Sequence, residues 1–191
     1  MNKLLRQVVL ILGKSGTGKT VLAKRLTENC KRILILDPLF EFGGTIFFTA
    51  DEVAAYLENN PEEFRIVLRP QEEEDVEFFF RIARSVGNVT LLVDEAEIYI
   101  SPGSMPDAFR WLVHFGRHVR VSIIAVARRA PELNVYLRAQ QTSMISFAQT
   151  EPRDVDHLVE YGFPREAVEA LEDHEYETLG SPEDAIAKLL P

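Results

Sequence analysis

The chain has 191 residues, of which 46% are hydrophobic, and a formal net charge of −9. This length and composition predict a single globular domain over residues 1–191, exclude a disordered chain and argue against a protein whose whole surface binds nucleic acid. The single cysteine, Cys30, excludes an internal disulfide, and because no stretch reaches the roughly 20 apolar residues of a membrane span we expect a cytoplasmic protein.

Short apolar runs alternate with segments of helical periodicity along the whole chain. Because strands that alternate with helices form parallel sheets covered on both faces, this pattern predicts a three-layer α/β/α sandwich with a mainly parallel central sheet. We expect strands at 8–12, 32–37, 46–48, 65–69, 89–95, 121–126, 143–147 and 176–179. We expect helices at 19–26, 51–60 with Asp51 as its cap, 72–86, 107–115, 132–140, 153–160, shortly after 164, and after 181.

The first predicted strand runs directly into the pattern Gly-x-x-x-x-Gly-Lys-Thr at residues 13–20, which is a P-loop. Glycines let the backbone turn so that successive N–H groups face a polyphosphate, and the helix that follows adds its positive N-terminal end. Lys19 supplies a mobile charge for the β- and γ-phosphates, and the Thr20 hydroxyl is a ligand for Mg²⁺. The predicted nucleotide-binding residues are Gly13, Lys14, Ser15, Gly16, Thr17, Gly18, Lys19, Thr20 and Val21.

The second pattern is acidic: Asp94 and Glu95 stand at the carboxyl end of the strand expected at 89–95. In a P-loop protein the first acid holds Mg²⁺ opposite Thr20, so we predict a metal site made of Thr20 and Asp94. Glu95 is placed to accept a proton from the attacking water. The chain has no Asn-Lys-x-Asp guanine-recognition pattern, so we expect ATP and Mg²⁺ as the nucleotide and the metal.

A third pattern combines the Gly116-Arg117 pair, the strand at 121–126, and then Arg128 and Pro131. The order of the three patterns resembles the HerA/FtsK superfamily of DNA-translocating P-loop ATPases, and the resemblance covers about residues 8–162. Segments 37–42, 145–147 and 151–155 also look like that family. A motor core of this size, with no room for an additional barrel or DNA-reading module, resembles the viral genome-packaging branch.

The resemblance implies a P-loop NTPase fold of the RecA-like, additional-strand type and a ring, expected to be a hexamer, that acts on double-stranded DNA. In such rings the active site lies between subunits, and Arg117 is the best candidate for an arginine finger on the neighbour. Arg128 stands where the family usually has a glutamine, so it either contacts the γ-phosphate within its own subunit or serves as the finger. The predicted catalytic residues are therefore Lys19, Glu95, Arg117 and Arg128.

The resemblance also implies a viral portal or capsid component as a partner, and a location in the host cytoplasm or the virion. Two other functions remain: a Zot-like ATPase for phage morphogenesis or export, and a small-molecule kinase. We interpret the histidines, His174 included, as structural or surface residues. Arg110, Arg129, Arg138 and the loop at 101–105 are candidates for DNA contacts.

Overall fold

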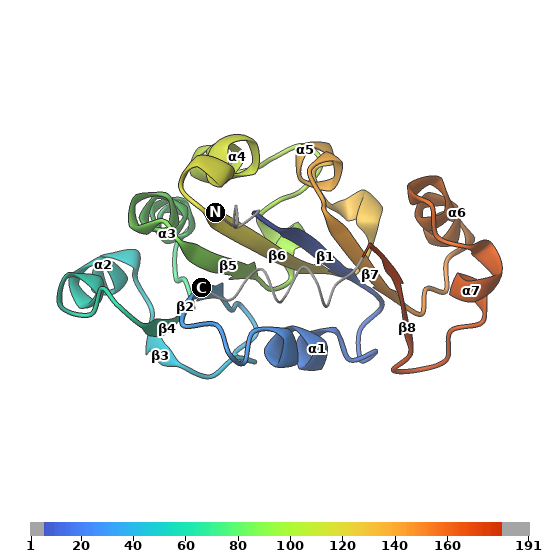
Figure 1. The fold of residues 1–191 in the computed structure, drawn as a ribbon, viewed down its shortest axis with the longest axis horizontal. Helices are drawn as coiled ribbons and strands as arrows, with labels where there is room; N and C mark the ends of the chain where they lie inside the picture. Colours follow the sequence, from blue (N-terminus) through green and yellow to red (C-terminus); the bar gives the residue numbers. More distant parts are fainter. Residues whose placement is uncertain (1–5, 181–191) are drawn as a thin grey trace, which may run out of the picture.

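The apolar runs pair side by side in one eight-stranded sheet in the computed structural model, which describes residues 6–180 (Figure 1). The strand order is β3-β4-β2-β5-β6-β1-β7-β8, and every neighbouring pair is parallel except β7 and β8, which are antiparallel. The strands are β1 (Val8–Leu12), β2 (Arg32–Leu36), β3 (Thr45–Phe47), β4 (Phe64–Leu68), β5 (Val89–Val93), β6 (Val121–Ala127), β7 (Ser143–Phe147) and β8 (Tyr176–Leu179).

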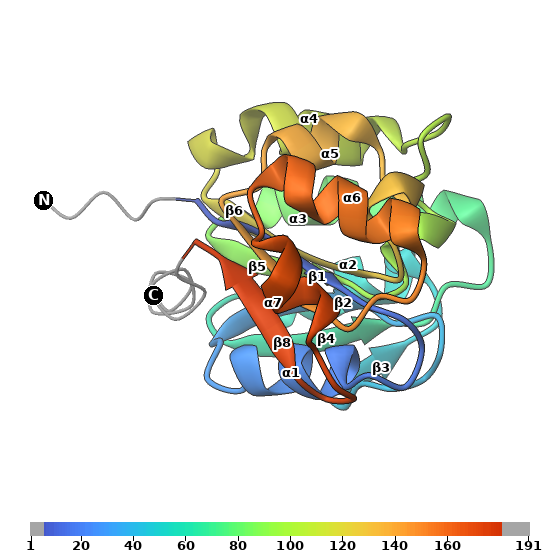
Figure 2. The same cartoon turned by 90° about the vertical axis from the view of Figure 1, so that its right-hand side faces the viewer.

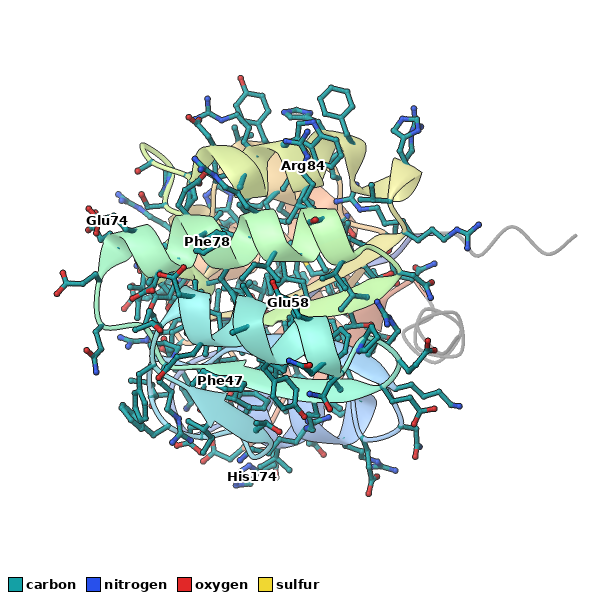
Figure 3. The ribbon with its side chains drawn as sticks, turned by 90° about the vertical axis from the view of Figure 1, so that its left-hand side faces the viewer. Phe47, Glu58, Glu74, Phe78, Arg84 and His174 are labelled. Carbon is teal, nitrogen blue, oxygen red and sulfur yellow. The ribbon has the colours of Figure 1, made fainter. Side chains whose placement is uncertain are left out.

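Helices cover the two faces of the sheet unequally. Figure 1 shows α2 to α5 on one face and α1 on the other, with α6 and α7 beyond the β8 edge. In Figure 3, Phe78 and Arg84 accordingly lie on the side of α3 and α4, and His174 lies on the side of α1. The helices are α1 (Lys19–Leu26), α2 (Ala50–Asn59), α3 (Glu73–Val86), α4 (Asp107–Phe115), α5 (Val135–Ala139), α6 (Pro152–Tyr161) and α7 (Arg165–Glu169).

Alternation along each strand divides the apolar core between these two faces. Leu10 and Leu12 of β1 pack into the cluster under the larger helical layer, whereas Val9 and Ile11 pack into the cluster under α1. Successive side chains of a strand point to opposite faces, so a central strand that is apolar throughout is buried on both. Phe79 and Phe80, both fully buried, belong to the larger cluster as core residues.

The carboxyl ends of the seven parallel strands meet at one edge of the sheet, which we call the carboxyl edge. The opposite edge, where these strands begin, is the amino edge. The seven residues of β6 cross from one to the other, a distance of about 23 Å. A residue just before β6 and a residue just after it therefore lie on opposite sides of the molecule.

The structure changes two of the predicted helices. The helix expected at 132–140 is instead a short 3-10 helix, Ala130–Glu132, followed by α5, because the Asn134 side chain accepts a hydrogen bond from the Tyr136 N–H (3.1 Å) and caps a new helix start. Helix α2 is capped by Thr49 rather than Asp51: the Thr49 hydroxyl accepts from the Glu52 N–H at 3.4 Å.

The other predicted strands and helices are present with small shifts at their ends. The strand expected at 46–48 covers Thr45–Phe47, and the strand expected at 89–95 ends at Val93. The helix predicted after 181 lies outside the described residues. No helix within residues 6–180 is long and apolar enough to cross a membrane.

Cys30 is buried against the end of the smaller core cluster, as expected of a small hydrophobic side chain. Its thiol lies 3.9 Å from the Thr90 hydroxyl, and burial raises the pKa of Cys30. A buried thiol that stays protonated at neutral pH is a poor nucleophile, so Cys30 has a packing role.

Candidate nucleotide-binding site

The loop between β1 and α1 has the backbone geometry of an anion cradle. Gly13, Gly16 and Gly18 all have positive φ angles, of 152°, 82° and 101°. A Cβ atom at Gly13 would lie 2.7 Å from the Phe147 Cβ and 2.9 Å from the Thr17 hydroxyl, closer than real atoms approach. Glycine is therefore required at position 13 both by the backbone angle and by the space beside β7.

Lys19 occupies the first position of α1, and its side chain folds back into the loop. The residue is 6% exposed, and its Nζ donates a hydrogen bond to the Lys14 carbonyl at 3.0 Å. Burial lowers the pKa of Lys19, whereas the charges of Glu95, Glu97 and Asp94 raise it. Helix α1 also lacks a side-chain cap at its N-terminus, so its first N–H groups are available to an anion in the loop.

Asp94 follows β5 directly and is 2% exposed. Burial, together with the carboxylates of Glu95 and Asp37, raises the pKa of Asp94 to about 7. The Thr20 hydroxyl, in the first turn of α1, and the Asp94 carboxylate are hard oxygen donors, which fits Mg²⁺. A divalent cation would offset the cost of a buried carboxylate in this place.

Glu95 adopts a left-handed conformation, with φ 44° and ψ 51°, that is uncommon for a residue with a side chain. This turn separates the side chain of Glu95 from that of Asp94, and Glu95 lines the cavity above the P-loop. Residues in sparsely populated conformations are frequent at functional sites. The geometry brings Lys19, Asp94 and Glu95 together as the sequence predicted, with Glu95 open to the cavity.

Arg128 links the end of β6 to Glu95 and Glu97, which follow the neighbouring strand β5. Its Nε lies 3.1 Å from Glu95 Oε2 and 3.6 Å from Glu97 Oε1, and its N–H donates to the same Glu97 oxygen at 3.2 Å. The Arg128 carbonyl accepts from the Gly13 N–H at 3.1 Å, which ties β6 to the P-loop. Arg128 therefore contacts both Glu95 and the P-loop of its own chain.

Glu97 is a site residue that the sequence did not single out. Burial, with a contribution from the Glu95 carboxylate, raises the pKa of Glu97 to about 7. Its Oε2 is buried and has no hydrogen-bond partner among residues 6–180. The only feature of the sequence that pointed to Glu97 was its position two residues after Glu95. An acidic residue at such a position in a loop is usually a solvated surface charge.

A cavity of about 620 Å³ opens beside the P-loop and α1. This volume suits a nucleotide-sized ligand. The P-loop and Glu95 line it together with residues that the sequence did not suggest, above all His174 and Tyr176. The lining residues are Ser15, Gly16, Thr17, Gly18, Lys19, Thr20, Val21, Leu22, Arg25, Leu39, Glu41, Glu95, Phe147, His174 and Tyr176.

Arg117 lies far from this cavity. It belongs to the short 3-10 helix Gly116–His118 that precedes β6, and its side chain is exposed at the amino edge. Because β6 separates the two edges, Arg117 does not reach the P-loop of its own subunit. The structure thus separates Arg117 from the other predicted catalytic residues.

Two arginines considered for DNA contacts are held by partners in the same chain. Arg129 Nε donates to both carboxylate oxygens of Asp154, at 3.0 and 2.7 Å. Arg138 donates to the Leu133 carbonyl at 3.1 Å and to the Tyr161 hydroxyl at 2.7 Å. These bonds give both arginines a structural role between α5, α6 and the end of β6.

The sheet order, the glycine-lined cradle and the acidic strand end define a P-loop NTPase with a three-layer α/β/α fold. The family model described as "AAA domain" matches residues 3–135, more than half of the chain, and the chain belongs to this family of P-loop ATPases. A comparison with curated proteins yields no significant match.

Solved structures give the same fold at low sequence identity. The genome packaging NTPase B204 from Sulfolobus turreted icosahedral virus 2, in complex with ATP-gammaS, superposes with a TM-score of 0.75 at 18% identity, covering 94% of both chains. VirB4 of Thermoanaerobacter pseudethanolicus gives 0.58 at 13% identity, covering 94% of this chain and 92% of that one. The N-terminal domain of zonular occludens toxin from Neisseria meningitidis gives 0.51 at 20%, covering 76% and 78%. The predicted fold and the resemblance to viral packaging ATPases of HerA/FtsK type are confirmed at the level of the fold.

Proposed function

We propose that this P-loop ATPase is a ring-forming motor that moves double-stranded DNA, with viral genome packaging as its process. The observation that carries the proposal is the division of the predicted catalytic residues between two edges. Lys19 and Glu95 line one cavity, with Asp94 and Arg128 as their charged neighbours, whereas Arg117 is exposed at the opposite edge. Such a division suits an active site that a neighbouring subunit completes.

In this proposal the triphosphate of ATP occupies the cradle at 13–18, with Lys19 against the β- and γ-phosphates. Thr20 and Asp94 hold Mg²⁺, which when bound neutralises charge on the phosphate oxygens. A water oxygen attacks the γ-phosphorus, the bond to the bridging β–γ oxygen breaks, and ADP leaves. Glu95 accepts the proton of that water.

Arg128 has a defined part in the same step. Its Nε lies 3.1 Å from Glu95 Oε2. A γ-phosphate in the cradle offers Arg128 a second anion, and a contact to it within the subunit would release Glu95 for the water. Arg117 of a neighbour then supplies the remaining positive charge, a contribution worth about 10³-fold or more in rate.

The acidic surface limits where DNA binds. A net charge of −9 repels the phosphate backbone over most of the protein, so we propose contacts confined to the lumen of the ring. Binding through a few lysine and arginine contacts should weaken steeply as salt rises. A free monomer would accordingly hold DNA poorly.

The test combines assembly with turnover. Gel filtration with a non-hydrolysable ATP analogue should show a ring, and ATPase activity should rise when duplex DNA is added. A strictly monomeric mass together with activity indifferent to DNA would overturn the motor proposal. ATPase activity in a ring that ignores DNA would favour the alternative, a Zot-like role in phage morphogenesis or export. A portal or capsid partner is tested by adding that component to the assay.

A further inference from the structure

We infer that the turn at 172–176, which leads into β8, forms the base-binding end of the nucleotide site. His174 and Tyr176 would contact the aromatic base of the nucleoside triphosphate while the P-loop holds its phosphates. The inference rests on the proposal that the cavity binds ATP, and it adds which residues of the chain recognise the base.

The turn is attached to the P-loop region at three points. Lys14 Nζ lies 3.4 Å from Asp173 Oδ1. A Cβ atom at Gly18 would lie 3.4 Å from His174 Nδ1, so the imidazole sits directly over the start of α1. The Tyr176 ring packs on the Phe147 ring with centroids 5.3 Å apart. Figure 2 shows the start of β8 beside α1, where these contacts are made.

The turn also holds its own shape. The Glu172 N–H donates to Glu175 Oε2 at 3.1 Å, and the Glu175 N–H donates to the Glu172 carbonyl at 3.1 Å. His174 lies between them with φ 71°, a left-handed conformation that costs a residue with a side chain free energy. The imidazole is thus presented by a closed loop at a fixed place on the cavity wall.

Charge and polarity distinguish the parts of the cavity wall that suit the phosphates and the base of a nucleotide. The P-loop supplies backbone N–H groups and Lys19, which suit phosphate. The wall beside the start of α1 carries the rings of His174 and Tyr176 and the apolar surface of Val21, which is 70% exposed. Glu172 and Glu175 of the same turn are exposed and add negative charge, which repels phosphate and leaves a neutral base unaffected.

Exposed rings at a cavity edge are suited to stacking on a planar base. His174 is exposed and Tyr176 is 44% exposed, so both have ring surface that no described side chain covers fully. Stacking tolerates any base because each has a π-face, and it favours purines because their face is larger. We therefore assign the site to nucleoside triphosphates with a preference for purines over pyrimidines.

The experiment separates the base from the phosphates by comparing ATP with inorganic tripolyphosphate. Isothermal titration calorimetry would give the affinity of both ligands for the wild-type chain and for Tyr176→Ala and His174→Ala. We expect ATP to bind about fivefold or more weakly to each variant, with tripolyphosphate affinity unchanged. Tyr176→Phe, which keeps the ring, should bind ATP like the wild type.

Matched controls are an exposed tyrosine and an exposed histidine outside the cavity. Tyr136→Ala and His157→Ala should leave the affinity of both ligands unchanged. Unchanged ATP affinity in Tyr176→Ala and His174→Ala would overturn the inference, and so would an equal loss for ATP and tripolyphosphate. If the wild type binds neither ligand, the cavity is not a nucleotide-binding site and the proposed function fails. Lys19→Ala provides the reference titration for a chain that has lost binding.

Discussion

The two ends of β6 carry arginines in opposite circumstances. Arg128, at the carboxyl edge, is paired with Glu95 and lies close to Glu97 and the P-loop. Arg117, at the amino edge, is exposed and forms no ion pair with an acidic residue of the segment 6–180. Its charged neighbour is Arg6, whose pKa is lowered to about 10 by burial first and by Arg117 second.

This comparison separates two ways of completing an ATPase site. An arginine already held by the acids of its own subunit is positioned to act in cis. An arginine that has no anionic partner and cannot reach the P-loop of its own chain can interact only with a phosphate bound to another subunit. The predictions below test this distinction.

The largest effect should come from the carboxyl edge itself. Lys19→Ala removes the buried ammonium from the cradle and should abolish ATP binding and turnover. Glu95→Gln keeps the shape but cannot accept a proton, so it should bind ATP and hydrolyse it at least about 10²-fold more slowly. Calorimetry and phosphate release measure the two effects. Equal turnover in Glu95→Gln would remove Glu95 from the base role.

The two arginines should differ in mixed rings. Arg117→Ala and Arg128→Ala should each lower turnover, the finger by about 10³-fold. When Arg117→Ala subunits are mixed with Lys19→Ala subunits, an intact cradle can meet an intact Arg117, so part of the activity should return. Arg128→Ala mixed with Lys19→Ala should stay inactive, because cradle and arginine belong to one chain. Rescue of Arg128→Ala, or none for Arg117→Ala, would reverse the assignment.

The raised pKa of Asp94 predicts a pH-dependent stability in metal-free protein. Burial raises this pKa to about 7, so the folded chain binds a proton more tightly than the unfolded chain does. This stabilisation is complete below pH ~4 and is lost as pH rises through about 7. Asp94→Asn has no such loss, so relative to the wild type it should gain about 2–4 kcal/mol between pH 5 and pH 8.

Thermal unfolding followed by circular dichroism at the two pH values tests this. Glu97→Gln should behave in the same direction, because burial also raises the pKa of Glu97 to about 7. A difference between wild type and Asp94→Asn that does not vary with pH would contradict the buried, protonated state of Asp94.

The smallest effect concerns Arg129, which follows Arg128 in the sequence but has a structural role. Its Nε donates to both carboxylate oxygens of the buried Asp154, which ties the end of β6 to α6. Arg129→Ala should cost about 1–2 kcal/mol of unfolding free energy, a partial loss because the arginine itself is half-exposed. The salt dependence of DNA binding should not change. A shallower salt dependence with unaltered stability would make Arg129 a phosphate contact instead.

The sheet could be predicted from sequence because its signals are local. A continuous apolar run such as 121–126 predicts a strand buried on both faces, and the fixed spacing of Gly13, Lys19 and Thr20 predicts the cradle. The first residue of each helix was harder to predict, because several nearby residues could act as its cap. Thr49 and Asn134 are the caps in the structure, through hydrogen bonds that their side chains accept.

The parts of the site that sequence reasoning missed depend on contacts between distant segments. His174 meets the P-loop only because β8 pairs with β7 after two intervening helices. Nothing in the residues around 174 indicates that contact. Arg117 and Arg128 are near each other in the sequence, and only the path of β6 shows that they lie at different edges.

The burial of Cys30 makes the chain convenient for single-molecule fluorescence. Because the only thiol is shielded and protonated, maleimide dyes should react slowly with the native protein. A cysteine placed at an exposed site outside the nucleotide cavity, such as Tyr136, would take one dye per subunit. Stepwise photobleaching would then count the subunits of an assembly directly, and energy transfer between dyes would report when one subunit turns against the next.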